Sequence, residues 1–336
     1  MIEPLLIPVD SYLIPSLPTV WFGVVLFTVA MYVALDGFDF GIGMLYALRE
    51  DDHERETMLA AFGPVWDANE VWLVAFGTTL LAAFPVVYSR LLSDHYLVAI
   101  GIVLALLFRG LGPELREQRE DAQWQRACSG LFVVGSLLSP LFIGMLVGSW
   151  VFAAGTLSLP SILTGVGLIA LSVTNGAAFL AAKTSGELRA AMRSYGIGAT
   201  LAYLGGVVVL LAVVVATDAG GAAETILSIP GVAVVGLSVA VALGGIVAAR
   251  TENDRLWFAS TLALSGLLVA LVALLLYPTV YPPGGLTIDD AVVSPLALNL
   301  TTVLGLPVLL VVLWYFKFLY GVFSGPIEPE GDGYGG

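Results

Sequence analysis

Long apolar stretches recur along the chain and constrain its fold more than any other feature. Residues 201–215 and 262–276, for example, are almost entirely apolar and do not alternate with polar residues. A helix needs about 20 mainly apolar residues to cross a membrane, whereas the strands of a membrane barrel are shorter and alternate. Only 12% of the 336 residues are charged, about half the share in a soluble domain. The sequence therefore predicts an all-α polytopic membrane protein.

About nine transmembrane helices are expected, in a single transmembrane domain over residues 1–324. Their approximate ranges are 18–46, 56–89, 95–113, 127–154, 159–182, 196–217, 227–249, 256–278 and 295–322. Residues 1–17 contain no Lys or Arg, so the basic start of a signal peptide is missing and the first helix is expected to stay in the mature protein. Residues 325–336 are rich in Gly, Pro and acidic residues, which predicts a flexible acidic tail.

The positions of the basic residues predict the orientation. Eleven of the 13 Lys and Arg residues lie in the odd-numbered connectors between expected helices or near the end of the last helix. The even-numbered connectors hold only Arg90, and Arg109 lies within a span. Because cytoplasmic loops are enriched in Lys and Arg, we expect a multi-pass protein of the cell membrane. Its N-terminus would lie outside and its C-terminus in the cytoplasm.

The formal net charge of −13 argues against nucleic acid as a partner, because surfaces that bind nucleic acid are basic. Dense carboxylate on exposed loops also suggests a halophilic source, where salt screens the repulsion. The single cysteine, Cys128, allows neither an internal disulfide nor a thiolate metal cluster.

Ionisable residues within the expected spans form the candidate functional site. They are the pairs Asp36/Asp39 and Asp67/Glu70, with Arg109 and the adjacent Glu114. A spacing of three places both carboxylates of each pair on one helical face, and a rise of about 1.5 Å per residue places all six near the cytoplasmic face. Such residues are costly in a bilayer and usually face protein or water. We expect a cluster that collects protons, although snorkelling of Arg109 to the headgroups is an alternative.

Histidine is scarce. His53 and His95 lie in or beside expected connectors, whereas a bis-His haem in the bilayer needs histidines within spans. Met31 and Met145 lie in spans, but isolated methionines usually serve packing. We therefore expect this chain to ligate neither haem nor metal.

The order and spacing of these polar residues resemble subunit II of cytochrome bd-type quinol oxidases along nearly the whole chain. The strongest stretches are Asp-Gly-Phe-Asp-Phe-Gly-Ile-Gly at 36–43 and Gly-Pro-Val-Trp-Asp-Ala-Asn-Glu-Val-Trp-Leu at 63–73. Further matching stretches are 81–88, 108–110, 114–116, 175–184, 281–290, 306–307 and 320–325. At 68–70 the chain has Ala-Asn-Glu where members of this family often have Gly-Asn-Gln or Gly-Asn-Glu, so Glu70 would add a second protonatable site.

The resemblance implies two four-helix bundles plus one peripheral helix, and a partner, subunit I, that holds two b-type haems and one d-type haem. The pair would oxidise quinol and reduce O2 to water with protons from the cytoplasm, which builds a proton-motive force. It also allows small single-helix accessory subunits, and an oxygen route or a structural quinone in subunit II, without assigning residues to either.

The resemblance also implies roles for individual residues. Asp67 matches an acidic residue at the subunit interface that is linked to proton delivery, and Glu70 and Asp36 are expected to transfer protons with it. Support of the partner's haems and of the subunit interface is expected from Trp66, Asp39, Arg109 and Asn69. No residue of this chain is expected to be catalytic.

Two other functions remain open. A proton-coupled secondary transporter would use intramembrane carboxylates to couple its substrate to protons, but its sites lie near the midplane and the chain shows no inverted repeat. A purely structural subunit would only support its partner.

Overall fold

The computed structural model describes residues 7–323 and residue 325. In this part of the chain, eight helices are long and apolar enough to cross a membrane. They are α1 (Leu17–Tyr46), α5 (Tyr96–Arg116), α6 (Ala122–Val151), α7 (Leu159–Lys183), α8 (Gly186–Thr217), α10 (Ile229–Arg250), α11 (Asp254–Leu276) and α13 (Pro295–Val322). These helices confirm the prediction of an all-α polytopic membrane protein.

The expected continuous span 56–89 was wrong, because three helices divide this segment: α2 (Asp52–Phe62), α3 (Trp66–Ala83) and α4 (Pro85–Asp94). Pro64 and Pro85 lack the N–H that a helix interior requires, and their rings clash with the preceding turn. The first break thus contains Pro64, and the second lies directly before Pro85. The other short helices are η1 (Ala219–Gly221), α9 (Ala222–Leu227), η2 (Pro282–Gly284) and α12 (Ile288–Ala291).

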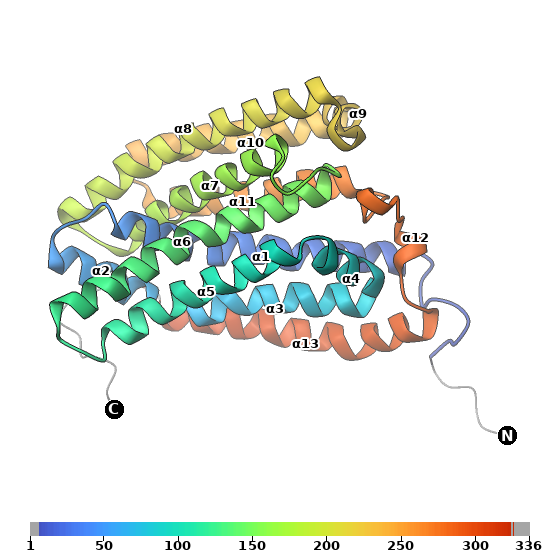
Figure 1. Ribbon diagram of the computed structural model, residues 1–336, viewed down its shortest axis with the longest axis horizontal. Helices are drawn as coiled ribbons and strands as arrows, with labels where there is room; N and C mark the ends of the chain where they lie inside the picture. Colours follow the sequence, from blue (N-terminus) through green and yellow to red (C-terminus); the bar gives the residue numbers. More distant parts are fainter. Residues whose placement is uncertain (1–6, 324, 326–336) are drawn as a thin grey trace.

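The long helices lie side by side along the long axis of the molecule (Figure 1). One end carries α2 and the connectors α5–α6, α7–α8 and α10–α11, and the opposite end carries α4, α9 and α12 (Figure 1). We call the first the basic end, because most of the Lys and Arg residues lie in the connectors there or in the helix ends beside them. Helix α13 lies at the edge of the molecule and contacts α3. The division into two four-helix bundles and one peripheral helix stays a prediction.

Helix α8 begins ten residues before its expected start at 196. The added turns carry charged residues that are paired at the basic end. Arg193 contacts both Asp254 at 2.8 Å and Glu252 at 3.1 Å, so these turns extend the helix beyond its apolar part. The predicted tail 325–336 lies outside the described residues except for Gly325.

Helix α1 is central and packs against α3, α6, α7 and α11. Its glycines allow this close approach. A Cβ on Gly41 would lie 2.0 Å from the carbonyl oxygen of Ser172 in α7, and one on Gly43 would lie 2.0 Å from Ser136 Oγ in α6. Only glycine fits at such contacts, where two helix backbones meet.

Polar contacts tie the chain together at the end opposite the basic end. Asn299 in α13 donates to the carbonyl oxygens of Pro8 and Ser11 and accepts from Leu13 N–H, each at 2.9 Å. Tyr281 donates to Asp94 at 2.6 Å. Burial and this hydrogen bond raise the pKa of Tyr281 above its usual range.

A buried polar cluster as the candidate functional site

Three helices bring the polar cluster together toward the basic end. Asp36 and Asp39 lie in the second half of α1, and Arg109 lies in the second half of α5. Asn69 and Glu70 lie in the first turns of α3. The helix break before Trp66 determines where α3 begins. It therefore also determines the level along α1 at which Asn69 and Glu70 lie.

Arg109 forms the centre of the cluster. Its guanidinium donates to Asp36 Oδ1 and, at 2.7 Å, to Glu70 Oε2. The side chains of Arg109 and Asp36 are fully buried, whereas that of Glu70 is 29% exposed. Arg109 therefore does not snorkel to the headgroups. It connects a buried carboxylate to one that reaches the surface of this chain.

Aromatic rings surround the guanidinium. Its central carbon lies 4.9 Å from the ring centroid of Phe40, 6.0 Å from that of Phe62 and 5.8 Å from that of Trp66. Phe62 and Trp66 are stacked with their centroids 5.6 Å apart and an interplanar angle of 6°. Such faces attract a cation and exclude water, so they fix Arg109 in one position.

A second set of hydrogen bonds holds Asp39. Asn69 Nδ2 donates to Asp39 Oδ2 at 2.8 Å, and Tyr320 Oη donates to Asn69 Oδ1 at 2.7 Å. Asp39 and Asn69 are fully buried. The last turns of α13 are thus connected through one amide to a carboxylate in α1.

The expectation that six ionisable residues converge was wrong for Asp67 and Glu114, which are both exposed in this chain. Successive residues of a helix are turned by about 100°, and Trp66 and Asn69 direct one face of α3 toward α1. Asp67 therefore lies on the outer face, with Val71 and Val74. Asp36, Asp39, Glu70 and Arg109 do come together.

Several polar atoms of the cluster have no hydrogen-bond partner among the described residues. They are Asp36 Oδ2, Asp39 Oδ1, Arg109 Nε and the hydroxyl of Tyr32. An unpaired polar atom in a buried site is costly. A further polar partner at these atoms, such as a water molecule, would lower this cost.

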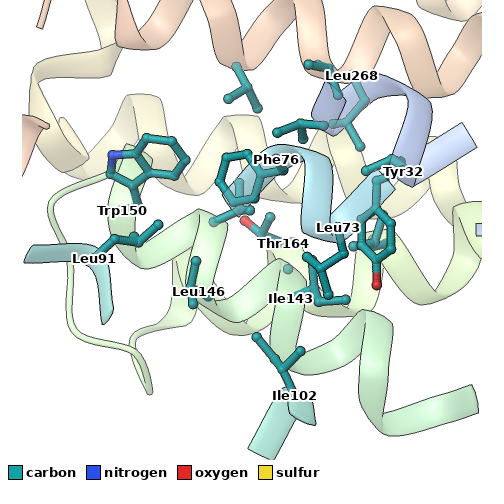
Figure 2. A pocket seen from close by; sticks show the side chains of 18 of the residues that line it. Tyr32, Leu73, Phe76, Leu91, Ile102, Ile143, Leu146, Trp150, Thr164 and Leu268 are labelled. Carbon is teal, nitrogen blue, oxygen red and sulfur yellow. The ribbon is translucent and has the colours of Figure 1, made fainter. Parts of the chain in front are cut away.

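An apolar cavity of about 310 Å³ adjoins the cluster. Figure 2 shows Tyr32 and Trp150 on opposite sides of this cavity, with Phe76, Ile143 and Leu146 between them. Tyr32 lies one helical turn before Asp36 on α1, so one side of the cavity leads to the cluster. The lining suits an apolar molecule.

The two histidines, His53 and His95, both lie outside the eight long helices. Both ring nitrogens of the buried His95 are engaged, Nδ1 with the carbonyl oxygen of Leu91 at 3.0 Å and Nε2 with Ser149 Oγ at 2.8 Å. His53 is exposed in the first turn of α2. Among residues 7–323 and 325, His, Cys, Asp and Glu form no group of three or more that would hold a metal ion.

Sequence reasoning missed the aromatic contacts and Tyr320. Tyr320 begins the matching stretch 320–325, but a tyrosine near the end of an apolar helix usually marks the membrane interface, so the sequence assigned it no role in the site. Its partner Asn69 lies 251 positions earlier.

Comparisons with known proteins identify the family of this chain. The model of the family described as cytochrome bd terminal oxidase subunit II matches residues 17–323. The chain is 27% identical to cytochrome bd-I ubiquinol oxidase subunit 2 of Escherichia coli (strain K12), over 89% of this chain and 92% of that protein. It is 31% identical to cytochrome bd ubiquinol oxidase subunit 2 of Bacillus subtilis (strain 168), over 52% and 56% respectively. The resemblance seen in the sequence is therefore confirmed, and the chain belongs to the cytochrome bd terminal oxidase subunit II family.

Proposed function

We propose that this chain is the haem-free subunit of a bd-type terminal quinol oxidase. With a haem-bearing subunit I it oxidises quinol, reduces O2 to water and takes the protons for this reaction from the cytoplasm. One observation carries the proposal beyond the family match. An intramembrane ion pair runs from the buried Asp36 through Arg109 to Glu70, which reaches the outer face of α3.

The outer face of α3 supports a partner at this position. Asp67 is exposed there, and Val71 and Val74 farther along the helix are 46% and 62% exposed. A charged side chain within the bilayer costs about 2.5–3.5 kcal/mol on insertion scales, and such residues almost always face protein or water. A subunit I that covers this face would shield Asp67 and Glu70 from lipid.

Three carboxylates are suited to proton transfer. Asp67 would receive protons at the subunit interface, and Glu70 lies three residues farther along α3 on the border of the same face. Asp36 has an unpaired carboxylate oxygen in the buried interior. Arg109 joins Glu70 and Asp36 electrostatically, so a proton gained at one of them changes the stability of the charge at the other.

Four residues are suited to support rather than transfer. Trp66 and Arg109 stack, while Asn69 and Asp39 are hydrogen bonded and fully buried. This rigid arrangement would present a fixed surface to subunit I and keep the partner's two b-type haems and one d-type haem in place. The engaged ring nitrogens of His95 support haem ligation by the partner alone.

The basic end is proposed to face the cytoplasm of the cell, with the N-terminus outside and the C-terminus inside, because Lys and Arg are enriched in cytoplasmic connectors. The apolar cavity beside Tyr32 is where a structural quinone or an oxygen route would fit. Small accessory subunits would bind the remaining lipid-facing helices. A proton-coupled transporter is not favoured, because the cluster lies toward one end of the bundle and not at its middle.

A pull-down of the tagged chain tests the assignment. The membranes are solubilised in mild detergent, and a reduced-minus-oxidised spectrum is recorded. Bands of b- and d-type haem with a second large subunit are expected. Bands of b-type haem alone would indicate a partner of different haem content, and an intact single chain without haem would contradict the oxidase assignment.

The variant Asp67→Asn separates proton transfer from scaffolding. We expect slower O2 reduction with full haem content, because the variant keeps the shape of the side chain and removes its proton site. Asp289→Asn, an exposed carboxylate at the opposite end, is the control and should turn over normally. Loss of haem in Asp67→Asn would instead assign this residue to scaffolding, and unchanged turnover would refute both roles.

A further inference from the structure

We propose that a cavity at the basic end is a second entrance for protons, and that the Tyr320–Asn69 hydrogen bond is the gate between this cavity and Asp39. The proposal rests on the proposed function, since it assumes that the complex consumes cytoplasmic protons. It assigns Asp39 a proton-accepting role in addition to support.

The cavity has a volume of about 230 Å³. It lies where α2 breaks from α3, and it is lined there by Ala61, Pro64 and Val65, with Phe179 of α7 and Tyr320 of α13 on the other sides. A water molecule occupies about 30 Å³ in the liquid, so the cavity can hold several.

Lys183 contributes to the wall of the cavity and holds the end of α13. Its ammonium donates to the carbonyl oxygen of Phe323, the C-terminal cap of α13, and to that of Gly325, which follows the helix. This contact keeps α13 against α7 and leaves the space beside Tyr320 open.

The observed hydrogen bonds describe a closed gate. The hydroxyl of Tyr320 donates a hydrogen bond to Asn69 Oδ1, and the amide N–H of Asn69 donates one to Asp39 Oδ2. A carboxamide does not pass a proton from its oxygen to its nitrogen without rearranging. In this arrangement, the series of hydrogen bonds from Tyr320 to Asp39 therefore does not conduct protons. The second oxygen of Asp39 has no hydrogen-bond partner among the described residues and is free to accept a proton.

Opening requires only that Tyr320 release Asn69. A hydronium ion in the cavity then gives its proton to the Tyr320 oxygen, and the hydroxyl proton of Tyr320 passes to Asp39 Oδ1, directly or through one water molecule. Asp39 becomes a carboxylic acid, Tyr320 is unchanged and water remains in the cavity.

Helix α13 is suited to this movement because it is the least buried of the eight long helices. In its most apolar part 11% of the residues are buried, compared with 50% in α1. Its opposite end is fixed by Asn299, which bonds three backbone groups of the N-terminal segment. The end near Tyr320 is held by the long side chain of Lys183, which can follow a shift of this end without detaching the helix.

The test measures proton uptake by the purified complex, with a pH-sensitive dye, when the chemically reduced enzyme reacts with O2. Tyr320→Phe keeps the ring and removes only the hydroxyl. Tyr315→Phe is the control, because Tyr315 is 46% exposed and makes no hydrogen bond among the described residues. Proton uptake should slow at least about fivefold in Tyr320→Phe, since a member of the relay is lost, with haem content unchanged. Tyr315→Phe should behave as the wild type.

A second variant, modified chemically, fills the cavity while Tyr320 stays unchanged. Ala60 is exposed and lines the cavity, and the native Cys128 is buried. Ala60→Cys is modified with a bulky thiol reagent, and mass spectrometry verifies the site. Slowed proton uptake after modification is expected, whereas modified Gln118→Cys, on the exposed α5–α6 connector, should show no change.

The outcomes separate this proposal from the oxidase assignment. Wild-type rates of proton uptake in Tyr320→Phe and in modified Ala60→Cys, with full haem and O2 reduction, would overturn the second entrance and leave the assignment intact. A second outcome would also overturn the proposal: Tyr320→Phe loses haem and proton uptake to the same extent, and modification of Ala60→Cys leaves proton uptake unchanged. Tyr320 would then be a structural anchor. A wild-type complex without haem or O2 reduction would overturn both.

Discussion

The buried ion pair of Arg109 and Asp36 permits a prediction about stability: a second substitution, at Asp36, should restore part of the free energy of unfolding that a substitution of Arg109 removes. Arg109→Met removes the cation and leaves the Asp36 carboxylate, which is fully buried, without its partner. Removal of one member of a buried pair costs about 3–5 kcal/mol. Glu70 adds little to this value, because its side chain is 29% exposed and solvent weakens such pairs.

The substitution Asp36→Asn should then rescue Arg109→Met. A buried pair that is replaced by neutral groups of similar size often leaves stability unchanged. We therefore expect the double variant to be more stable than Arg109→Met by about 2–4 kcal/mol, although Asp36→Asn alone destabilises the protein. Independent substitutions would add instead.

The assay is unfolding of the detergent-solubilised complex with increasing SDS, followed by tryptophan fluorescence, for the wild type, both single variants and the double variant. Arg90→Met is the control, because Arg90 is exposed and its loss should change the free energy of unfolding by less than about 0.5 kcal/mol. A double variant that is as unstable as the sum of the single variants would refute the pairing as the source of the effect.

Three further predictions follow from the packing and the charge. Gly41→Val should prevent assembly or destabilise the complex by about 1–3 kcal/mol or more, because the new side chain meets Ser172. Gly23→Ala is the control in the same SDS titration and should have no such effect, because no atom lies within 4 Å of its Cβ. Asn299→Leu should expose the backbone of the N-terminal segment to hydrogen exchange, since buried amide partners are lost at about 1–3 kcal/mol, and unchanged protection around Leu13 would contradict this. If the net charge of −13 reflects a high-salt habitat, the complex should lose thermal stability in dilute buffer, and full stability there would refute the halophile hypothesis.

The sequence alone was enough to predict most of the membrane helices, because a spanning helix is local and depends on a long apolar stretch. It failed in the segment 56–89, where apolar residues continue through two prolines. Pro64 and Pro85 were visible, yet prolines are tolerated within the membrane helices of this same chain, at Pro140 and Pro307. Hydropathy alone does not distinguish the two cases, since the outcome depends on whether neighbouring groups satisfy the freed carbonyl.

The candidate site was predictable in part for a similar reason. Depth along each helix placed Asp36 and Arg109 at one level, and the structure pairs them. Rotation about each helix axis decides which side chains face one another, and it depends on tertiary packing. Asp67 is therefore turned outward although Asn69 is buried, and the bond from Tyr320 to Asn69 was hidden by their distance in the sequence.

The break between α2 and α3 connects the fold to both parts of the site. Phe62, the last residue of α2, still stacks on Trp66, the first residue of α3, and both rings lie beside Arg109. The break thus preserves the aromatic support of the ion pair. At the same time it places Pro64 and Val65 on the wall of the cavity beside Tyr320. Pro64→Ala, which restores the N–H that a continuous helix needs, should therefore change haem retention and proton uptake together. Tyr320→Phe should change proton uptake alone. If Pro64→Ala and Tyr320→Phe had the same effects on haem retention and proton uptake, the ion pair of Arg109 and the cavity beside Tyr320 would not be separate parts of the site.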